Sequence, residues 1–144
     1  MDADLLLCDH AEAVNGKLYI NGGGWNLLFA VGAPVNISLA ILIEVPWDEA
    51  NRRHRLRVDL LTVDGELVEM DDGNAISIPG EFEVGRPPGI KPGTSLNTPI
   101  VVNVAGLKLE AGGYEWRLFI GDEPVARRPF QVTPPPGMPG VASF

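Results

Sequence analysis

Two acidic turns carry the residues whose types and spacing come nearest to a metal site. The segments Asp64-Gly65-Glu66 and Asp71-Asp72-Gly73-Asn74 lie close together in the sequence and are rich in carboxylate and amide side chains. Calcium prefers such oxygen ligands, so one hypothesis is a calcium- or small-molecule-binding sandwich domain with its site on these turns. Asp, Asn and Gly are also ordinary turn residues, because they hydrogen-bond locally and accept positive φ. We favour turn formation and expect neither a metal nor a cofactor.

The single cysteine and the two histidines form no pattern of a nucleophile or a metal centre. Cys8 and His10 stand two residues apart on a predicted strand, which separates them by about 6.5 Å along the backbone. We therefore expect Cys8 to be a small buried apolar residue. Gly22-Gly23-Gly24 is followed by no Lys-Ser/Thr pair, so it predicts a kink between strands rather than a phosphate loop. No convergent acid, base and nucleophile is visible, and we expect no catalytic residue and no enzyme.

Arginines and one aromatic residue on three predicted strands make the best candidate for a binding surface. Arg53, Arg55 and Arg57 alternate along one strand, and Arg117 and Arg127 lie on the last hairpin. An immunoglobulin-like arrangement makes these strands neighbours in one sheet, so their outward positions share a surface, here called the Arg–Phe face. Its partner-binding candidates are Arg55, Arg57, Leu61, Arg117, Phe119 and Arg127. Interfaces are enriched in Arg and aromatic residues, so we expect Phe119→Asp to break partner capture or self-association without unfolding the chain.

The alternative for the Arg–Phe face is an ordinary solvated surface. Cross-strand ion pairs such as Arg57 with Glu115 would then neutralise it, and exposed pairs of this kind contribute little to stability. Two irregular segments are further candidates for contact with a partner. They are the loop at residues 85–99 and the Pro-rich tail at residues 133–144.

The Arg–Phe face depends on the strands that carry it. The best-defined of these predicted elements is the hairpin at residues 109–125. From Tyr114 to Ile120 two series of residues alternate, which is the period of a strand with one buried face. Gly121-Asp122 has Gly first, as a type II′ hairpin turn requires. The Gly113-Tyr114 step, a few residues after a leucine, is typical of the tyrosine corner of immunoglobulin-like sandwiches.

Alternation and turn residues predict further strands along the chain. Residues 35–45 are the clearest case, and Pro46 ends them. Residues 10–16 are expected to be a connector, and Pro129 predicts that the last strand lies at a sheet edge. The predicted strands are 3–9, 17–21, 25–31, 35–45, 54–63, 66–70, 75–84, 100–105 with 107–109, 114–120 and 125–132, and the strand at 75–84 is expected to be broken at Pro79-Gly80.

The regular spacing of short strands and turns predicts an all-β fold. We expect an immunoglobulin-like two-sheet antiparallel sandwich of seven to nine strands with a Pro-rich C-terminal tail. Transthyretin-like and C2-like sandwiches are the nearest alternatives. A chain of 144 residues is expected to form one domain, here residues 1–132, followed by an extended or disordered tail at residues 133–144.

The charge balance limits the classes of partner that we expect, and the cysteine content limits the cellular compartment. Asp and Glu number 19 against 11 Lys and Arg, which gives a formal net charge of -8. We expect no nucleic-acid and no membrane partner, because binding to phosphates needs clustered Lys and Arg. The apolar run at residues 37–45 is too short to span a bilayer. A single cysteine cannot form an internal disulfide, so we expect a cytoplasmic protein.

Three motifs resemble an uncharacterised bacterial family of unknown function. They are Leu-Leu-Cys-Asp-His-Ala from Leu6 to Ala11, Asn-Gly-Lys-Leu-Tyr-Ile-Asn-Gly-Gly up to Gly23, and Leu-x-x-Gly-Gly-Tyr-x-Trp from Leu109 to Trp116. The resemblance covers about residues 4–132 and departs from the family pattern at His10, where an aromatic residue is expected. It implies an immunoglobulin-like sandwich and carries no known activity or site residues.

The function that we expect is therefore a non-catalytic protein-binding or assembly module. Its partner is expected to be another protein or a second copy of the chain. A small-molecule or calcium site on the acidic turns is the alternative, since the same sandwich architecture hosts many functions.

Overall fold

Alternation between apolar and other residues gives β4 (Val35–Val45) a fully buried inner face. In the computed structural model, which describes residues 1–135, five residues of one parity, from Ile37 to Val45, are at most 1% exposed. This strand pairs antiparallel with β1 (Asp2–Val14) on one side and β7 (Leu96–Leu107) on the other. The strand predicted at residues 35–45 is confirmed to the residue.

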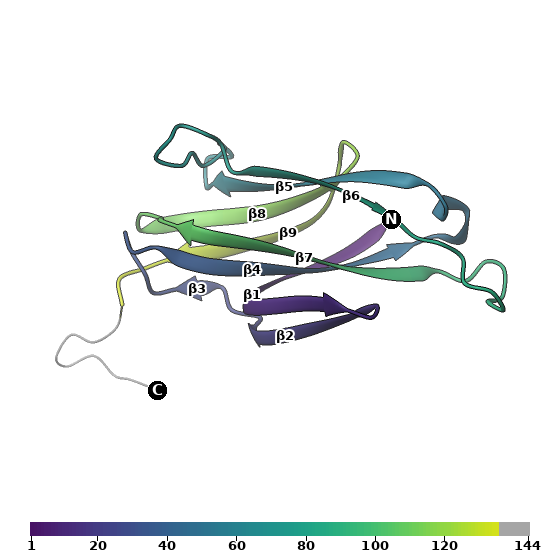
Figure 1. Ribbon diagram of the computed structural model, residues 1–144. Coiled ribbons are helices and arrows are strands. Elements are labelled where there is room, and N and C mark those ends of the chain that lie inside the picture. Colours follow the sequence, from purple (N-terminus) through teal and green to yellow (C-terminus); the bar gives the residue numbers. More distant parts are fainter. Residues whose placement is uncertain (136–144) are drawn as a thin grey trace.

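Two sheets face each other across the core (Figure 1). One has the strand order β2-β1-β4-β7 and the other the order β3-β9-β8-β5-β6. The described chain thus forms nine strands in two layers, and the predicted all-β sandwich is confirmed. The remaining elements are β2 (Lys17–Gly23), β3 (Leu27–Leu28), the 3-10 turn η1 (Trp47–Glu49), β5 (Arg53–Thr62), β6 (Ser77–Glu83), β8 (Gly112–Ile120) and β9 (Glu123–Val132).

The core lies between the inward parities of the two sheets. Leu5 and Leu7 of β1 contribute from one side, and Trp116 and Leu118 of β8 contribute from the other. All four are at most 2% exposed. Full burial of such side chains contributes roughly 1.5–3 kcal/mol each, which is the main force that holds the sheets together.

The last hairpin has the local structure that its residues predict. β8 and β9 are joined by two residues, and Gly121 has φ of 61° while Asp122 stays outside the positive-φ region. This is the type II′ geometry. The Tyr114 hydroxyl donates a hydrogen bond to the carbonyl oxygen of Glu110 at 2.9 Å, so the predicted tyrosine corner is confirmed.

The first hairpin is longer than predicted. Residues 10–16, expected to be a connector, instead continue β1 to Val14 and leave only the turn Asn15-Gly16. Both turn residues have positive φ, 50° and 73°, as a type I′ turn requires. The prediction was wrong because most residues at this end of the hairpin are exposed on both faces, so no alternation marks them as a strand.

Four other predicted segments differ from the structure. Residues 66–70 form only isolated bridges, and residues 25–31 contain only the short β3, which runs parallel to β9. The proline-rich loop ends before residue 96 rather than after residue 99, because the buried Leu96 pairs with Val45 and opens β7. β6 runs unbroken through Pro79-Gly80. Proline is accepted in β6 and β7 because both are edge strands.

Pro129 lies in β9, which was predicted to be an edge strand and is an edge over most of its length. β3 pairs only with Gln131 and Val132, so the rest of β9 has a neighbour on one side alone among the described residues. Most of the Pro-rich tail predicted at residues 133–144 lies outside the described residues. Within residues 1–135 no helix has the length and apolar content needed to cross a bilayer.

Candidate functional site

The register of three neighbouring strands brings the predicted arginines onto one face. Arg57 of β5 stands opposite Phe119 of β8, and Arg117 of β8 stands opposite both Asp59 and Arg127. Directly opposed residues project from the same side of a sheet. The order β9-β8-β5, on which the prediction of the Arg–Phe face depended, is therefore confirmed.

Arg57 lies over the aromatic ring of Phe119. Its Cζ atom is 4.2 Å from the ring centroid, a cation–π contact that contributes about 0.5–1 kcal/mol at an exposed site. Its Nε also donates to both carboxylate oxygens of Asp59, at 3.1 and 3.2 Å. The ion pair predicted between Arg57 and Glu115, both in the described chain, does not form. In the register Glu115 stands opposite Leu61, whereas Asp59 is the next residue along on the same face of β5.

Asp59 is the buried acceptor that fixes this part of the face. It is only 7% exposed, and the Ser77 hydroxyl of β6 donates to its Oδ1 at 2.6 Å. Because Asp59 is held from the other side, it holds the Arg57 guanidinium in place above Phe119. Asp59 was not among the predicted partner-binding residues of the face, and its role was missed. The available signal was the Arg57-x-Asp59 spacing, since residues two apart on a strand share a face.

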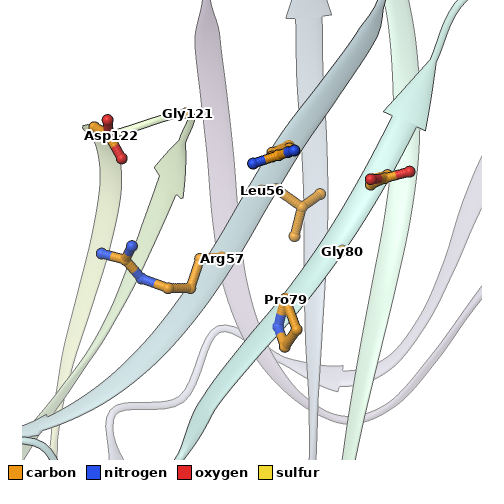
Figure 2. A pocket seen from close by; sticks show the side chains of 8 residues that line it. Leu56, Arg57, Pro79, Gly80, Gly121 and Asp122 are labelled. Carbon is orange, nitrogen blue, oxygen red and sulfur yellow. The ribbon is translucent and has the colours of Figure 1, made fainter.

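Arg55 borders a hollow at the turn end of the face. The hollow has a volume of about 770 Å³ and is lined by Arg55, Leu56, Arg57, Pro79, Gly80, Glu81, Gly121 and Asp122. Figure 2 shows Arg57 extending from β5 toward the hairpin that carries Gly121 and Asp122. Arg55 is exposed and forms no ion pair with any described residue. Glu81, its register partner on β6, lies 3.7 Å from Nε of Arg53 instead.

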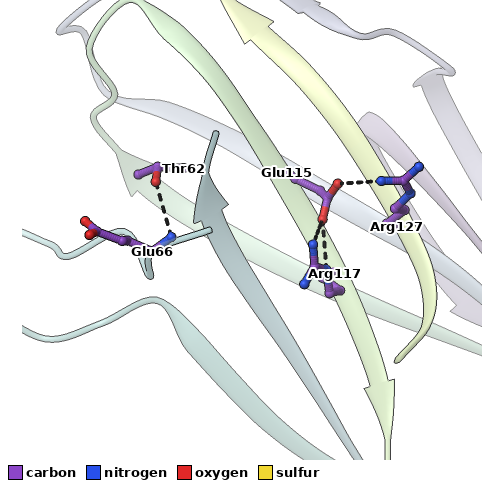
Figure 3. Close-up of polar contacts among 5 residues, drawn as sticks. All are labelled: Thr62, Glu66, Glu115, Arg117 and Arg127. Carbon is purple, nitrogen blue, oxygen red and sulfur yellow. Dashed lines mark hydrogen bonds and ion pairs between the residues drawn. The ribbon is translucent and has the colours of Figure 1, made fainter. Parts of the chain in front are cut away.

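Glu115 holds two other arginines of the face at once (Figure 3). Nε and Nη2 of Arg117 donate to its Oε2 at 2.8 and 2.5 Å, and Nη1 of Arg127 donates to its Oε1 at 3.4 Å. The side chain of Glu115 is 15% exposed, whereas that of Arg127 is 73% exposed. Two guanidinium groups thus share one carboxylate, and most of the Arg127 side chain faces solvent.

Leu61 is the one predicted member of the face that offers almost no surface. It is 7% exposed and forms a backbone bridge with Leu67 from the segment that follows β5. Its outward parity was correct, but the returning chain lies beside it. The structure therefore brings together Arg55, Arg57, Arg117, Phe119 and Arg127, and it leaves Leu61 out of reach.

The acidic turns use a carboxylate in turn hydrogen bonds. Asp72 accepts from the backbone N–H of Asn74 at 2.9 Å and from its Nδ2 at 3.0 Å. These two hydrogen bonds, the backbone one first, lower the pKa of Asp72. Within residues 1–135 no group of three or more His, Cys, Asp or Glu residues is placed to hold a metal ion. A second hollow of about 640 Å³ beside these turns has a polar lining that includes Glu66, Asp71, Lys108 and Glu110.

The cysteine and the histidines make polar contacts with different partners and not with one another within the described chain. Cys8 is 0% exposed, as predicted, and its Sγ donates to the carbonyl oxygen of Ser38 at 3.3 Å. Burial raises the pKa of this thiol, which disfavours the nucleophilic thiolate. His10 is exposed on β1, and Nε2 of His54 lies 2.8 Å from the carbonyl oxygen of Glu49.

Comparison with known proteins places the chain in a family. A model of a family of unknown function, DUF6941, matches residues 3–133, and the chain belongs to that family. The match confirms the resemblance to a family without known function that the motifs indicated. A search of curated proteins gave no match.

Proposed function

We propose that this member of a family of unknown function is a non-catalytic protein-binding module whose contact surface is the Arg–Phe face. One observation carries the proposal. Phe119 is half-buried beneath Arg57, and the exposed Arg55 and Arg127 lie on either side of it along the register. Arginine and aromatic side chains are the residues that dominate binding energy at protein interfaces.

The central part of the face is held in place before any partner arrives. Asp59 fixes Arg57, and Glu115 fixes Arg117. A side chain that is already ordered loses less conformational entropy on binding, so more of the contact energy appears as affinity. This order supports the interpretation that the Arg–Phe face binds a partner, rather than the alternative that it is an ordinary solvated surface.

The chemistry of the exposed groups favours a partner with carboxylates. Arg55 has no ion pair within the described chain, and Arg127 shares Glu115 with Arg117. Guanidinium groups bind carboxylates through paired, charge-assisted hydrogen bonds. We therefore propose that the partner is a protein segment that bears Asp or Glu beside an apolar residue that contacts Phe119.

The compartment and the absence of catalysis are parts of the same proposal. The one cysteine is buried and has no second cysteine in the chain to pair with, and a chain without disulfides suits a reducing, cytoplasmic environment. The described histidines and Cys8 do not converge on a common point, which supports binding rather than catalysis.

Affinity capture with matched variants tests the proposal. The immobilised chain is exposed to an extract of its source cells, and the retained proteins are quantified by mass spectrometry. We expect Phe119→Asp and Arg55→Glu each to reduce retention of the specific partner at least about tenfold, since loss of a central interface residue costs more than 1.4 kcal/mol. Circular dichroism of each variant is expected to match that of the unaltered chain.

Arg52→Glu is the matched control. Arg52 is exposed, lies outside the face and is 3.7 Å from Glu49, so the variant makes the same charge change elsewhere. We expect it to retain the partner. Equal retention by all four proteins would contradict the proposal, and so would equal loss from Arg52→Glu and Arg55→Glu, because that result indicates a net-charge effect.

A further inference from the structure

β7 is a long edge strand without a charged residue. Its twelve residues, Leu96–Leu107, include no Asp, Glu, Lys or Arg, and Pro99 is its only proline. β4 pairs with one side, and no described strand pairs with the other. Such an edge presents a row of free N–H and C=O groups that can pair with another strand.

The other edges of the sandwich carry the usual protections against such pairing. β6 contains Pro79, Glu81 and Glu83 within seven residues. β9 contains Pro124 and Pro129 together with two arginines, and it is partly covered by β3. β2 is short, begins with a lysine and ends in glycines. Charges, prolines and short length are the devices that keep edge strands apart, and β7 has the fewest of them.

The core is also less well closed at β7 than elsewhere. Ile100, Val102 and Val104 face the core cluster but are only half-buried. Their register partners on β4 include Ile41 and Leu39, both 0% exposed. A strand added beside β7 would cover the remaining apolar surface of these three side chains, which is favourable by about 25 cal/mol per Å².

We propose that two copies of this chain associate through antiparallel pairing of their β7 strands. The two four-stranded sheets then form one continuous sheet across a two-fold axis. A second copy is the favoured occupant because two identical β7 edges, paired antiparallel about the two-fold axis, satisfy each other's free N–H and C=O groups and bring no charged residues together. The net charge of -8 on each chain opposes contact through charged surfaces, so the uncharged β7 edge is where two copies can meet.

This interface is independent of the Arg–Phe face. β7 belongs to the β2-β1-β4-β7 sheet, and the Arg–Phe face belongs to the other sheet. The dimer leaves both Arg–Phe faces free for partners. Mass measurement tests the dimer and affinity capture tests the face, so either proposal can fail without the other.

Measurement of the solution mass tests the pairing. Light scattering after size exclusion, at protein concentrations from about 1 to 200 μM to bracket a micromolar Kd, is expected to give twice the 15.5 kDa chain mass at the upper end. The double variant Asn103→Lys/Ala105→Lys puts like charges across the two-fold axis. We expect it to raise the dimer Kd at least about tenfold.

Three further variants make the result specific. Tyr19→Lys/Asn21→Lys places the same charges on β2, the other edge of the same sheet, and is expected to stay dimeric. Asn103→Ser/Ala105→Ser makes a change without charge on β7 and is also expected to stay dimeric, which shows that loss of the Asn103 contact with Ser38 is not the cause. Phe119→Asp is expected to stay dimeric as well. Hydrogen exchange at β7 should be slower in the dimer than in the Lys double variant.

Four results would overturn the pairing. The first is a monomeric unaltered chain at every concentration, and the second is an equal loss of the dimer in the β2 variant. The third is a dimer that Phe119→Asp dissociates and the β7 double variant does not, because that assigns self-association to the Arg–Phe face. The fourth is growth into fibres rather than a closed dimer.

Discussion

The outer faces of the two sheets share one core but differ in what covers them. On the β1–β4 pair the middle of the outer face is built from small buried residues, and Cys8, Ala40 and Ser38 are 0%, 2% and 4% exposed. On the β5–β8 pair the outer face consists of arginines, carboxylates and Phe119. Burial on the first comes from close packing of small side chains with Leu6 and neighbouring residues. The second face stays open because long charged side chains keep their heads in water.

This difference separates two ways in which a sandwich can meet other proteins. The sheet that carries the Arg–Phe face offers side chains to a partner, and contacts with it depend on charge and on an aromatic surface. The other sheet presents little reactive side-chain chemistry, so its capacity for contact lies in the backbone of its free edge. Ser38 illustrates the point, because even its hydroxyl is bound to Asn103 of β7 at 2.6 Å.

The largest effect is expected from one charge placed on each outer face. Ala40→Lys should lower the free energy of unfolding by about 3 kcal/mol, because a buried small residue is replaced by a long charged one. Phe119→Lys should lower it by only about 1–2 kcal/mol, since it loses the cation–π contact with Arg57 and the buried part of a half-buried ring. Urea unfolding monitored by tryptophan fluorescence checks both. Equal losses would show that the two faces do not differ as described.

An effect of intermediate size is expected at the tyrosine corner, which lies in β8 of the sheet that carries the Arg–Phe face. Tyr114→Phe removes the hydrogen bond to Glu110 and should lower the free energy of unfolding by about 1 kcal/mol. Burial, followed by the nearby Glu110 charge, raises the pKa of Tyr114. The native state then holds this proton more tightly than the unfolded chain does.

The pH dependence of this corner follows from that shift. The stabilisation is complete below the unfolded pKa, near 10, and is lost as the pH rises through the raised folded pKa. The free energy of unfolding, measured at several pH values between 8 and 12, should therefore decline less steeply in Tyr114→Phe than in the unaltered chain. Parallel declines would assign the alkaline loss to other groups.

The smallest effect is expected at the acidic turn, which belongs to neither face. The hydrogen bonds from Asn74 lower the pKa of Asp72, so its stabilisation is present above the ordinary carboxyl pKa and is lost as the pH falls through the lowered one. Asp72→Ala should lower the melting temperature slightly at neutral pH and should make its fall between pH 5 and 2 less steep, as measured by thermal unfolding. Calcium should shift the melting temperature of neither protein. A calcium shift that Asp72→Ala abolishes would restore the metal-site hypothesis.

Local chemistry in the sequence was enough to predict several elements. β4 was predicted to the residue because its alternation is regular and Pro46 stops it. The II′ turn at Gly121 and the Tyr114 corner were predictable because each depends on residues a few positions apart. The Arg–Phe face followed once three strands were taken as neighbours.

Contacts between distant residues were not predictable in the same way. The partner of Arg57 depends on register, which places Glu115 opposite Leu61 and leaves Asp59 as the nearest acceptor. Leu61 is buried because a segment without strand periodicity returns beside it. The free edge of β7 depends on strand order within the sheet, which residue spacing does not record.

Photo-crosslinking from position 119 tests the central claim most directly. A benzoylphenylalanine at Phe119 reports which protein touches the Arg–Phe face, and the same residue at the exposed Tyr19 of β2 is the control. The account predicts one dominant crosslinked protein from position 119, absent from position 19 and lost on Arg55→Glu. Identical crosslinking patterns from both positions, or no crosslink from position 119 beyond background, would contradict it.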